Sequence, residues 1–122
     1  MKKILVYLGD INPKKNSSWG IFNVSLKILE SIEKSKRLEL VLVITNKNKN
    51  LFSKHKCKKY FLNETEGILN KFKRDNLDIN KIIKKEKPEI ALFPRGFLPL
   101  KKVRSTEYIP FIHDLIPLYY LR

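Results

Sequence analysis

Two predicted strands, at residues 3–8 and 38–45, constrain most strongly what this chain can fold into, because each contains an unbroken apolar run, at residues 4–8 and 40–44. Neither run alternates with polar residues, which is typical of strands that are buried on both faces of a parallel sheet. Between them, residues 19–34 repeat apolar side chains close to the helical period of 3.6. A strand, a helix and a second strand within this length form the βαβ unit, whose crossover is right-handed.

The rest of the chain continues this alternation. We expect brief strands at residues 59–62, 89–93 and 108–113, and a short helix at 51–55. Two further helices are predicted at 64–74 and 79–87, and Pro88 ends the second. The first should face inward with Ile68, Leu69 and Phe72, and the second with Ile79, Ile82 and Ile83. The predicted fold class is α/β, a Rossmann-like, doubly wound and mainly parallel sheet of about five strands with flanking helices.

Length and composition indicate one domain. The chain has 122 residues, of which 43% are hydrophobic, enough for a single packed core. No run approaches the roughly 18 apolar residues that cross a bilayer. Cys57 is the only cysteine, so an internal disulfide is excluded and a reducing cytosol fits. The lysines around Cys57 should favour its thiolate.

The charge is strongly positive, with 26 Lys and Arg against 12 Asp and Glu, a net +14. Residues 47–59 contain six lysines and no acid. Such a field attracts anionic lipid headgroups, phosphorylated substrates or nucleic acid, of which nucleic acid is the least favoured. The excess is mostly Lys in a chain also rich in Ile and Asn, so an unspecific basic surface remains an alternative.

The loop at residues 9–20 is the first candidate binding element. It follows the first predicted strand and leads into a helix, whose free N–H groups can bind anions. Gly20 would let a ligand approach the backbone closely. Neither the Gly-x-Gly-x-x-Gly fingerprint nor a P-loop is present. The alternative is an ordinary helix start capped by Ser17 or Ser18.

Two further candidates follow later strands. Arg95 comes directly after the strand at 89–93 and could grip a phosphate or carboxylate bidentately. His113 ends the last strand and can exchange a proton or hydrogen-bond sugar hydroxyls. Asp114 could orient His113 or cap the next segment. The alternatives are an exposed loop arginine and an ordinary histidine at a strand end. With two histidines and one cysteine, no zinc site is expected.

Three segments resemble the N-terminal domain of a GT-B glycosyltransferase of the kind grouped in glycosyltransferase family 4. Residues 18–26 (SWGIFNVSL) stand where the family has a Gly-Gly-Ile-Gly-like loop opening a helix, and Gly20 matches one of those glycines. Residues 88–94 (PEIALFP) are similar to a Pro-Asp-hydrophobic-hydrophobic-His strand. Residues 109–118 (IPFIHDLIPL) are similar to a strand that ends in His-Asp-Leu-x-Pro and are the most specific of the three.

The resemblance implies transfer of a sugar from a nucleotide-sugar donor, with no metal or other cofactor, to a glycan or lipid-linked acceptor. His113 would be the catalytic residue at the interdomain cleft, and Trp19, Gly20, Arg95 and Asp114 would contact substrate. The family's nucleotide-binding C-terminal domain is not part of these 122 residues. We therefore expect residues 1–122 to be a single acceptor-side domain, incomplete at its C-terminus and inactive alone.

The expected partners are that missing domain or a separate chain, the two substrates, a second copy of the chain and an anionic membrane surface. The expected location is the cytoplasm, at the inner face of the membrane. Two alternatives remain open. One is a small non-enzymatic basic module that binds an anionic partner through Lys54, Lys56, Lys58 and Lys59. The other is a complete small enzyme with a flavodoxin-like strand order.

Overall fold

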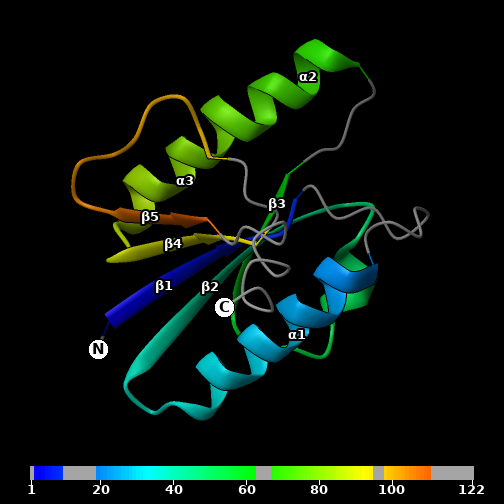
Figure 1. Ribbon diagram of the computed structural model, residues 1–122, viewed down its shortest axis with the longest axis vertical. Coiled ribbons are helices and arrows are strands. Elements are labelled where there is room, and N and C mark those ends of the chain that lie inside the picture. The colour runs from blue at the N-terminus through cyan, green and yellow to red at the C-terminus, as the bar shows by residue number, and fades with distance from the viewer. Residues whose placement is uncertain (1, 10–18, 63–66, 95–97, 111–122) are drawn as a thin grey trace, which may run out of the picture.

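A computed structural model describes residues 2–9, 19–62, 67–94 and 98–110, and for residues 19–21 the backbone alone. The described helices and strands form two layers of helix around one sheet (Figure 1). In chain order they are β1 (Lys2–Tyr7), α1 (Trp19–Lys34), β2 (Leu38–Thr45), the 3₁₀ turn η2 (Lys49–Phe52), β3 (Lys58–Leu62), α2 (Ile68–Lys73), the π-helical turn η3 (Arg74–Asp78), α3 (Ile79–Glu86), β4 (Ile90–Phe93) and β5 (Glu107–Pro110).

The sheet has five strands in the order β3-β2-β1-β4-β5, and every neighbouring pair is parallel. Strand β1 is central and pairs with β2 from Lys2 opposite Leu38 to Tyr7 opposite Val43. On its other side β1 pairs with β4, although these two strands are far apart in the sequence. The expected Rossmann-like α/β class is therefore confirmed, and the sheet is all-parallel.

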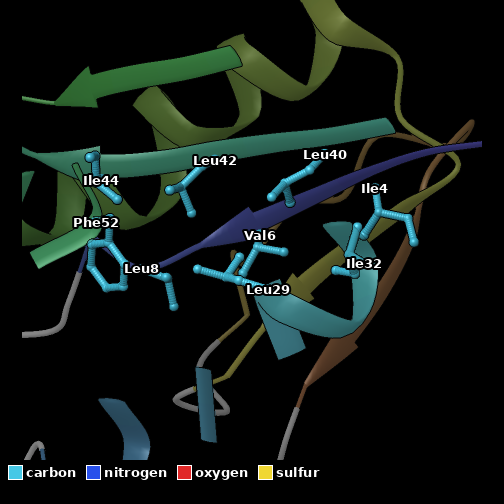
Figure 2. Close-up of a cluster of buried hydrophobic side chains, with 9 residues drawn as sticks. All are labelled: Ile4, Val6, Leu8, Leu29, Ile32, Leu40, Leu42, Ile44 and Phe52. Carbon is cyan, nitrogen blue, oxygen red and sulfur yellow. The ribbon is translucent and has the colours of Figure 1, made fainter. Parts of the chain in front are cut away.

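Each face of the sheet has its own apolar core. On one face, alternate residues of β1 and β2 pack against α1 and η2, and Figure 2 shows this cluster of Ile4, Val6, Leu8, Leu29, Ile32, Leu40, Leu42, Ile44 and Phe52. On the other face, the intervening strand residues pack against α3. Because both faces are covered, the central strands need apolar residues at every position, which explains their unbroken runs.

Most predicted elements match the structure within two residues, including α1 and β2 at both ends. The third helix also behaves as predicted, since Ile79, Ile82 and Ile83 are buried. Lys87 adopts a left-handed conformation and ends α3 directly before Pro88. The short helix predicted at 51–55 is instead the 3₁₀ turn η2, which ends at Phe52.

The prediction for residues 64–74 was wrong in two respects. The helix begins at Ile68, and it joins α3 without a break through the π-helical turn η3. Its supposed inner face is exposed, with Ile68 at 87%, Leu69 at 84% and Phe72 at 53% of their full accessibility. The apolar spacing is genuinely helical, but no residue of this half of the helix belongs to either buried core cluster.

A buried carboxylate ties the end of α3 to the amino ends of two strands. Glu86 accepts a hydrogen bond from Tyr60 Oη at 2.8 Å, and its carboxylate lies 2.5 Å from Lys58 Nζ and 3.5 Å from Lys3 Nζ. Burial by itself disfavours the charge on Glu86. The hydrogen bonds from Lys58 and Tyr60 and the charge of Lys3 outweigh burial, so the pKa of Glu86 lies below its ordinary value.

Leu29 and Leu69 are both helical leucines, but only Leu29 is buried. Leu29→Ala should lower the free energy of unfolding by about 3 kcal/mol, because it removes core contacts and leaves a cavity. Leu69→Ala should change it by less than about 0.5 kcal/mol. Urea denaturation of both variants measures the difference. If both variants lost the same free energy of unfolding, the exposed position of Leu69 on α2 would be contradicted.

Glu86→Gln should lower stability at neutral pH, because it removes the negative charge that Lys58 and Lys3 contact. A carboxylate whose pKa is lowered by folding stabilises the protein above its unfolded pKa, about 4.3 for Glu. That contribution disappears as the pH falls through the lowered pKa of Glu86 in the folded protein. When denaturation is measured at a series of pH values, the free energies of unfolding of the wild type and of Glu86→Gln should therefore differ at pH 7 and converge toward pH 3. The control is Glu30→Gln at an exposed position on α1. It should change the free energy of unfolding little at pH 7 or at pH 3.

Candidate functional site

The strand order locates the candidate site at the carboxyl edge of the sheet, beside β1 and β4. From β1 the chain moves outward to β2 and β3, then returns to the other side of β1 as β4 and continues to β5. The connections that leave β1 and β4 therefore diverge. In open α/β sheets, ligands bind in the crevice that such a reversal creates outside the carboxyl ends of the strands.

The structure describes only part of the residues predicted for this site. Trp19 and Gly20 are the first two residues of α1, and their backbone is helical. Because α1 connects the parallel strands β1 and β2, its first turn lies at the carboxyl edge. Arg95, His113 and Asp114 lie outside the described residues. Strand β4 ends at Phe93 and β5 at Pro110, shortly before these three residues in the sequence.

Three aromatic rings cross the carboxyl half of the sheet on the α3 face. Tyr7 and Phe93 meet edge to face, with their ring centroids 5.7 Å apart. Phe93 and Tyr108 are stacked, with centroids 5.6 Å apart. Tyr108 Oη donates to Asn80 Oδ1 at 2.7 Å and accepts from Val103 N at 3.0 Å. These contacts join the carboxyl ends of β1 and β4 to the first half of β5 and form one aromatic support.

A polar cluster lies next to this support, formed by Tyr7, Arg74 and Asp75. Tyr7 Oη hydrogen-bonds Asp75 Oδ1, and Arg74 Nε donates to the same oxygen at 2.9 Å. Burial disfavours the charge of Arg74, but the hydrogen bond and the negative charge of Asp75 outweigh it and raise its pKa. The pair keeps a charged guanidinium buried at the end of β1.

Sequence reasoning missed this cluster. Two signals could have pointed to it: a phenol at the end of an aliphatic strand, and an Arg-Asp pair where two predicted helices meet. The π-helical turn carries both charged residues. Such turns insert an extra residue in a helix and are often found at functional sites.

Gly9 and Asn48 shape the backbone at the end of β1. A Cβ atom on Gly9 would come within 2.2 Å of the Tyr7 ring, so only glycine allows the chain to turn so close to that ring. Asn48 is fully buried; its Nδ2 donates to Leu8 O at 2.8 Å, and its Oδ1 accepts from Thr45 N at 2.9 Å. One side chain therefore joins the carboxyl ends of β1 and β2.

Residues 54–58 of the lysine-rich segment lie at the opposite, amino edge of the sheet, whereas the start of the segment, at Asn48, lies at the carboxyl edge. His55 is buried, and its Nδ1 lies 2.6 Å from Glu33 Oε1. Cys57 is half-buried beside Lys54 and Lys56 in a cavity of about 430 Å³. Burial raises the pKa of Cys57 more than Lys59 lowers it, so the expected stabilisation of the thiolate was wrong.

The described residues contain no group of three or more His, Cys, Asp or Glu side chains that could hold a metal ion. In the same part of the chain, no helix is both long and apolar enough to cross a membrane.

Asn48→Ala should lower the free energy of unfolding by about 3 kcal/mol, because Leu8 O and Thr45 N would lose buried partners. The matched control is Asn50→Ala, two residues away and exposed, which should change stability by less than about 0.5 kcal/mol. Urea denaturation of both variants is the measurement. A small effect of Asn48→Ala would mean that this edge does not depend on its side chain.

Compared with models of protein families, with curated proteins and with solved structures, the chain has no significant match.

Proposed function

We propose that this chain is the N-terminal, acceptor-side domain of a glycosyltransferase that transfers a sugar from a nucleotide-sugar donor to a glycan or lipid-linked acceptor. The observation that carries the proposal is the adjacency of β1, β4 and β5 in an all-parallel sheet. The segments that contain Gly20, Arg95 and His113 follow these three neighbouring strands in the sequence. A crevice at this reversal point of the sheet is where such a fold binds its ligand.

In this proposal, each residue has a distinct role. His113 hydrogen-bonds the donor sugar and phosphate at the cleft, with Asp114 orienting its imidazole. Arg95 binds a phosphate or carboxylate group. The first turn of α1, with Trp19 and Gly20, offers free backbone N–H groups to substrate oxygens. The Tyr7–Phe93–Tyr108 stack supplies the rigid base that positioning of this kind requires.

The transfer joins an acceptor hydroxyl oxygen to the anomeric carbon as the bond from that carbon to the nucleotide breaks, and the hydroxyl proton passes to a phosphate oxygen of the leaving nucleotide. The leaving nucleotide carries the negative charge that develops, and positive groups at the crevice would stabilise it. The proposal assigns most nucleotide binding to a second domain outside these 122 residues. The chain alone is therefore expected to bind the acceptor without turnover.

The rival proposal, a non-enzymatic basic module, receives less support from the charge distribution. Lys58 is paired with Glu86, and Glu33 and Glu39 line the same cavity as Lys54 and Lys56. These acids interrupt the positive surface on which the module would depend. A purely electrostatic partner would also bind with a steep salt dependence and lose affinity on neutralisation of Lys54 and Lys56.

The test uses extracts of source cells from which the gene for this chain has been deleted. Adding back the purified full product of that gene, with any further domain that it carries, should restore incorporation of label from a nucleotide-sugar panel into glycan or lipid products. His113→Ala should reduce that incorporation at least about a hundredfold, the usual loss when a hydrogen-bond donor to the charge of the transition state is removed. The matched control is the other histidine, His55→Gln, at the amino edge of the sheet, checked for folding by circular dichroism. Full activity of His113→Ala, or labelling that does not depend on the chain, would contradict the proposal.

A further inference from the structure

The first half of the long helix projects beyond the sheet with apolar side chains uncovered. Figure 1 shows α2 extending past the strands, whereas α3 lies along them. No residue of α2 is buried. Ile68 and Leu69 are the two most exposed large hydrophobic side chains in the described part of the chain, and Phe72 follows them one turn later. Three large apolar side chains on one helix face are costly to leave in water unless they have a partner.

The apolar strip continues from the helix onto a neighbouring loop. Phe72 and Leu77 line a groove of about 540 Å³ together with Leu100, which is 78% exposed. The loop is held against the helix, because Leu100 N donates to Asn76 Oδ1 and Asn80 Nδ2 donates to Lys101 O, both at 2.8 Å. The groove is therefore formed before any partner arrives.

Exposed lysines surround this strip on both segments. They are Lys71, Lys73, Lys81, Lys84, Lys101 and Lys102. Within residues 67–84 and 98–103 the acids are Asp75 and Asp78, and Asp75 is paired with Arg74. The surface thus combines protruding apolar side chains with an almost uninterrupted positive rim. At the amino edge of the sheet, by contrast, acids lie among the lysines.

We propose that this surface, formed by α2, η3, the first turns of α3 and residues 100–103, docks onto an anionic lipid bilayer. Apolar side chains on a helix enter the boundary between headgroups and acyl chains, and flanking lysines extend to the phosphates. Each lysine near an anionic surface adds to the electrostatic attraction, so a rim of six exposed lysines would contribute strongly to binding.

The chemistry of the surface fits lipid better than protein. The cores of protein interfaces are depleted in lysine, yet here lysines lie beside every apolar side chain. A second copy of this chain would bring two positive rims together, which is unfavourable. A bilayer supplies both an apolar interior and a continuous layer of negative charge.

Docking in this way would turn the carboxyl edge of the sheet toward the membrane. Helix α2 precedes α3, which runs antiparallel to the strands, so its free end lies on the carboxyl side. If the proposed glycosyltransferase function holds, a lipid-linked acceptor would then reach the crevice from the bilayer. Binding itself does not depend on that function, since vesicles contain neither donor nor acceptor.

The test is sedimentation with vesicles of phosphatidylglycerol and phosphatidylcholine, and with phosphatidylcholine alone. The wild-type chain should bind the anionic vesicles, and added salt should weaken binding. Ile68→Ser/Leu69→Ser should weaken it at least about tenfold, because two inserted side chains are lost. Lys101→Gln/Lys102→Gln should weaken it by a similar factor. The matched control, Lys54→Gln/Lys56→Gln, removes the same charge elsewhere and should change binding by less than about twofold.

Ile68 and Leu69 are exposed, so thermal unfolding of their double variant should match that of the wild type. Unchanged vesicle binding by this variant, or equal binding to neutral vesicles, would overturn the proposal. A third outcome would also overturn it: the wild type does not bind vesicles and self-associates, and the Ile68→Ser/Leu69→Ser variant is monomeric. That last result would assign the surface to contact between copies.

Discussion

The pairing of β1 on both sides is the constraint on which the rest of the structure depends. It places β2 on one side and β4 on the other, and so fixes where the chain must reverse. Its alternate residues enter two cores, with Val6 in the α1 core and Leu5 in the α3 core. A helix is needed on each face because an uncovered parallel sheet would leave one of these cores in water.

The two edges of the sheet are built differently, with ion pairs at the amino edge and hydrogen-bonded polar side chains at the carboxyl edge. At the amino edge, Glu86 holds Lys3 and Lys58 and closes the end of α3 against the strands. At the carboxyl edge, polar groups are held in place by packing: Asn48 joins two strand ends, and Tyr7 meets the Arg74–Asp75 pair. A rigid edge with oriented polar groups is suited to hold a ligand. The lysines within residues 54–58 lie at the amino edge.

Much of the fold was predictable, because buried strands and amphipathic helices leave a direct pattern. The bounds of α1 and β2 match at both ends, and Ile79, Ile82 and Ile83 are buried as expected. The error at α2 has a clear cause. Helical spacing of apolar residues shows that one face of a helix is apolar, but not whether another element packs on that face. Ile68 and Leu69 were therefore expected in the core, although both are exposed. The Tyr7–Arg74–Asp75 cluster left only indirect signals, since Tyr7 is distant in sequence from the Arg74–Asp75 pair and meets it only in the tertiary structure.

The sequence by itself determined the α/β class, the order of the elements and which face of each helix is apolar. Local periodicity carries that information, because each element must bury an apolar face whatever its neighbours are. Only the tertiary structure decided which strands adjoin β1, which charges are paired and which apolar face stays open. Those properties depend on contacts between residues far apart in the chain. The buried Glu86 carboxylate and the exposed Leu69 side chain both depend on what lies beside them rather than on their residue type.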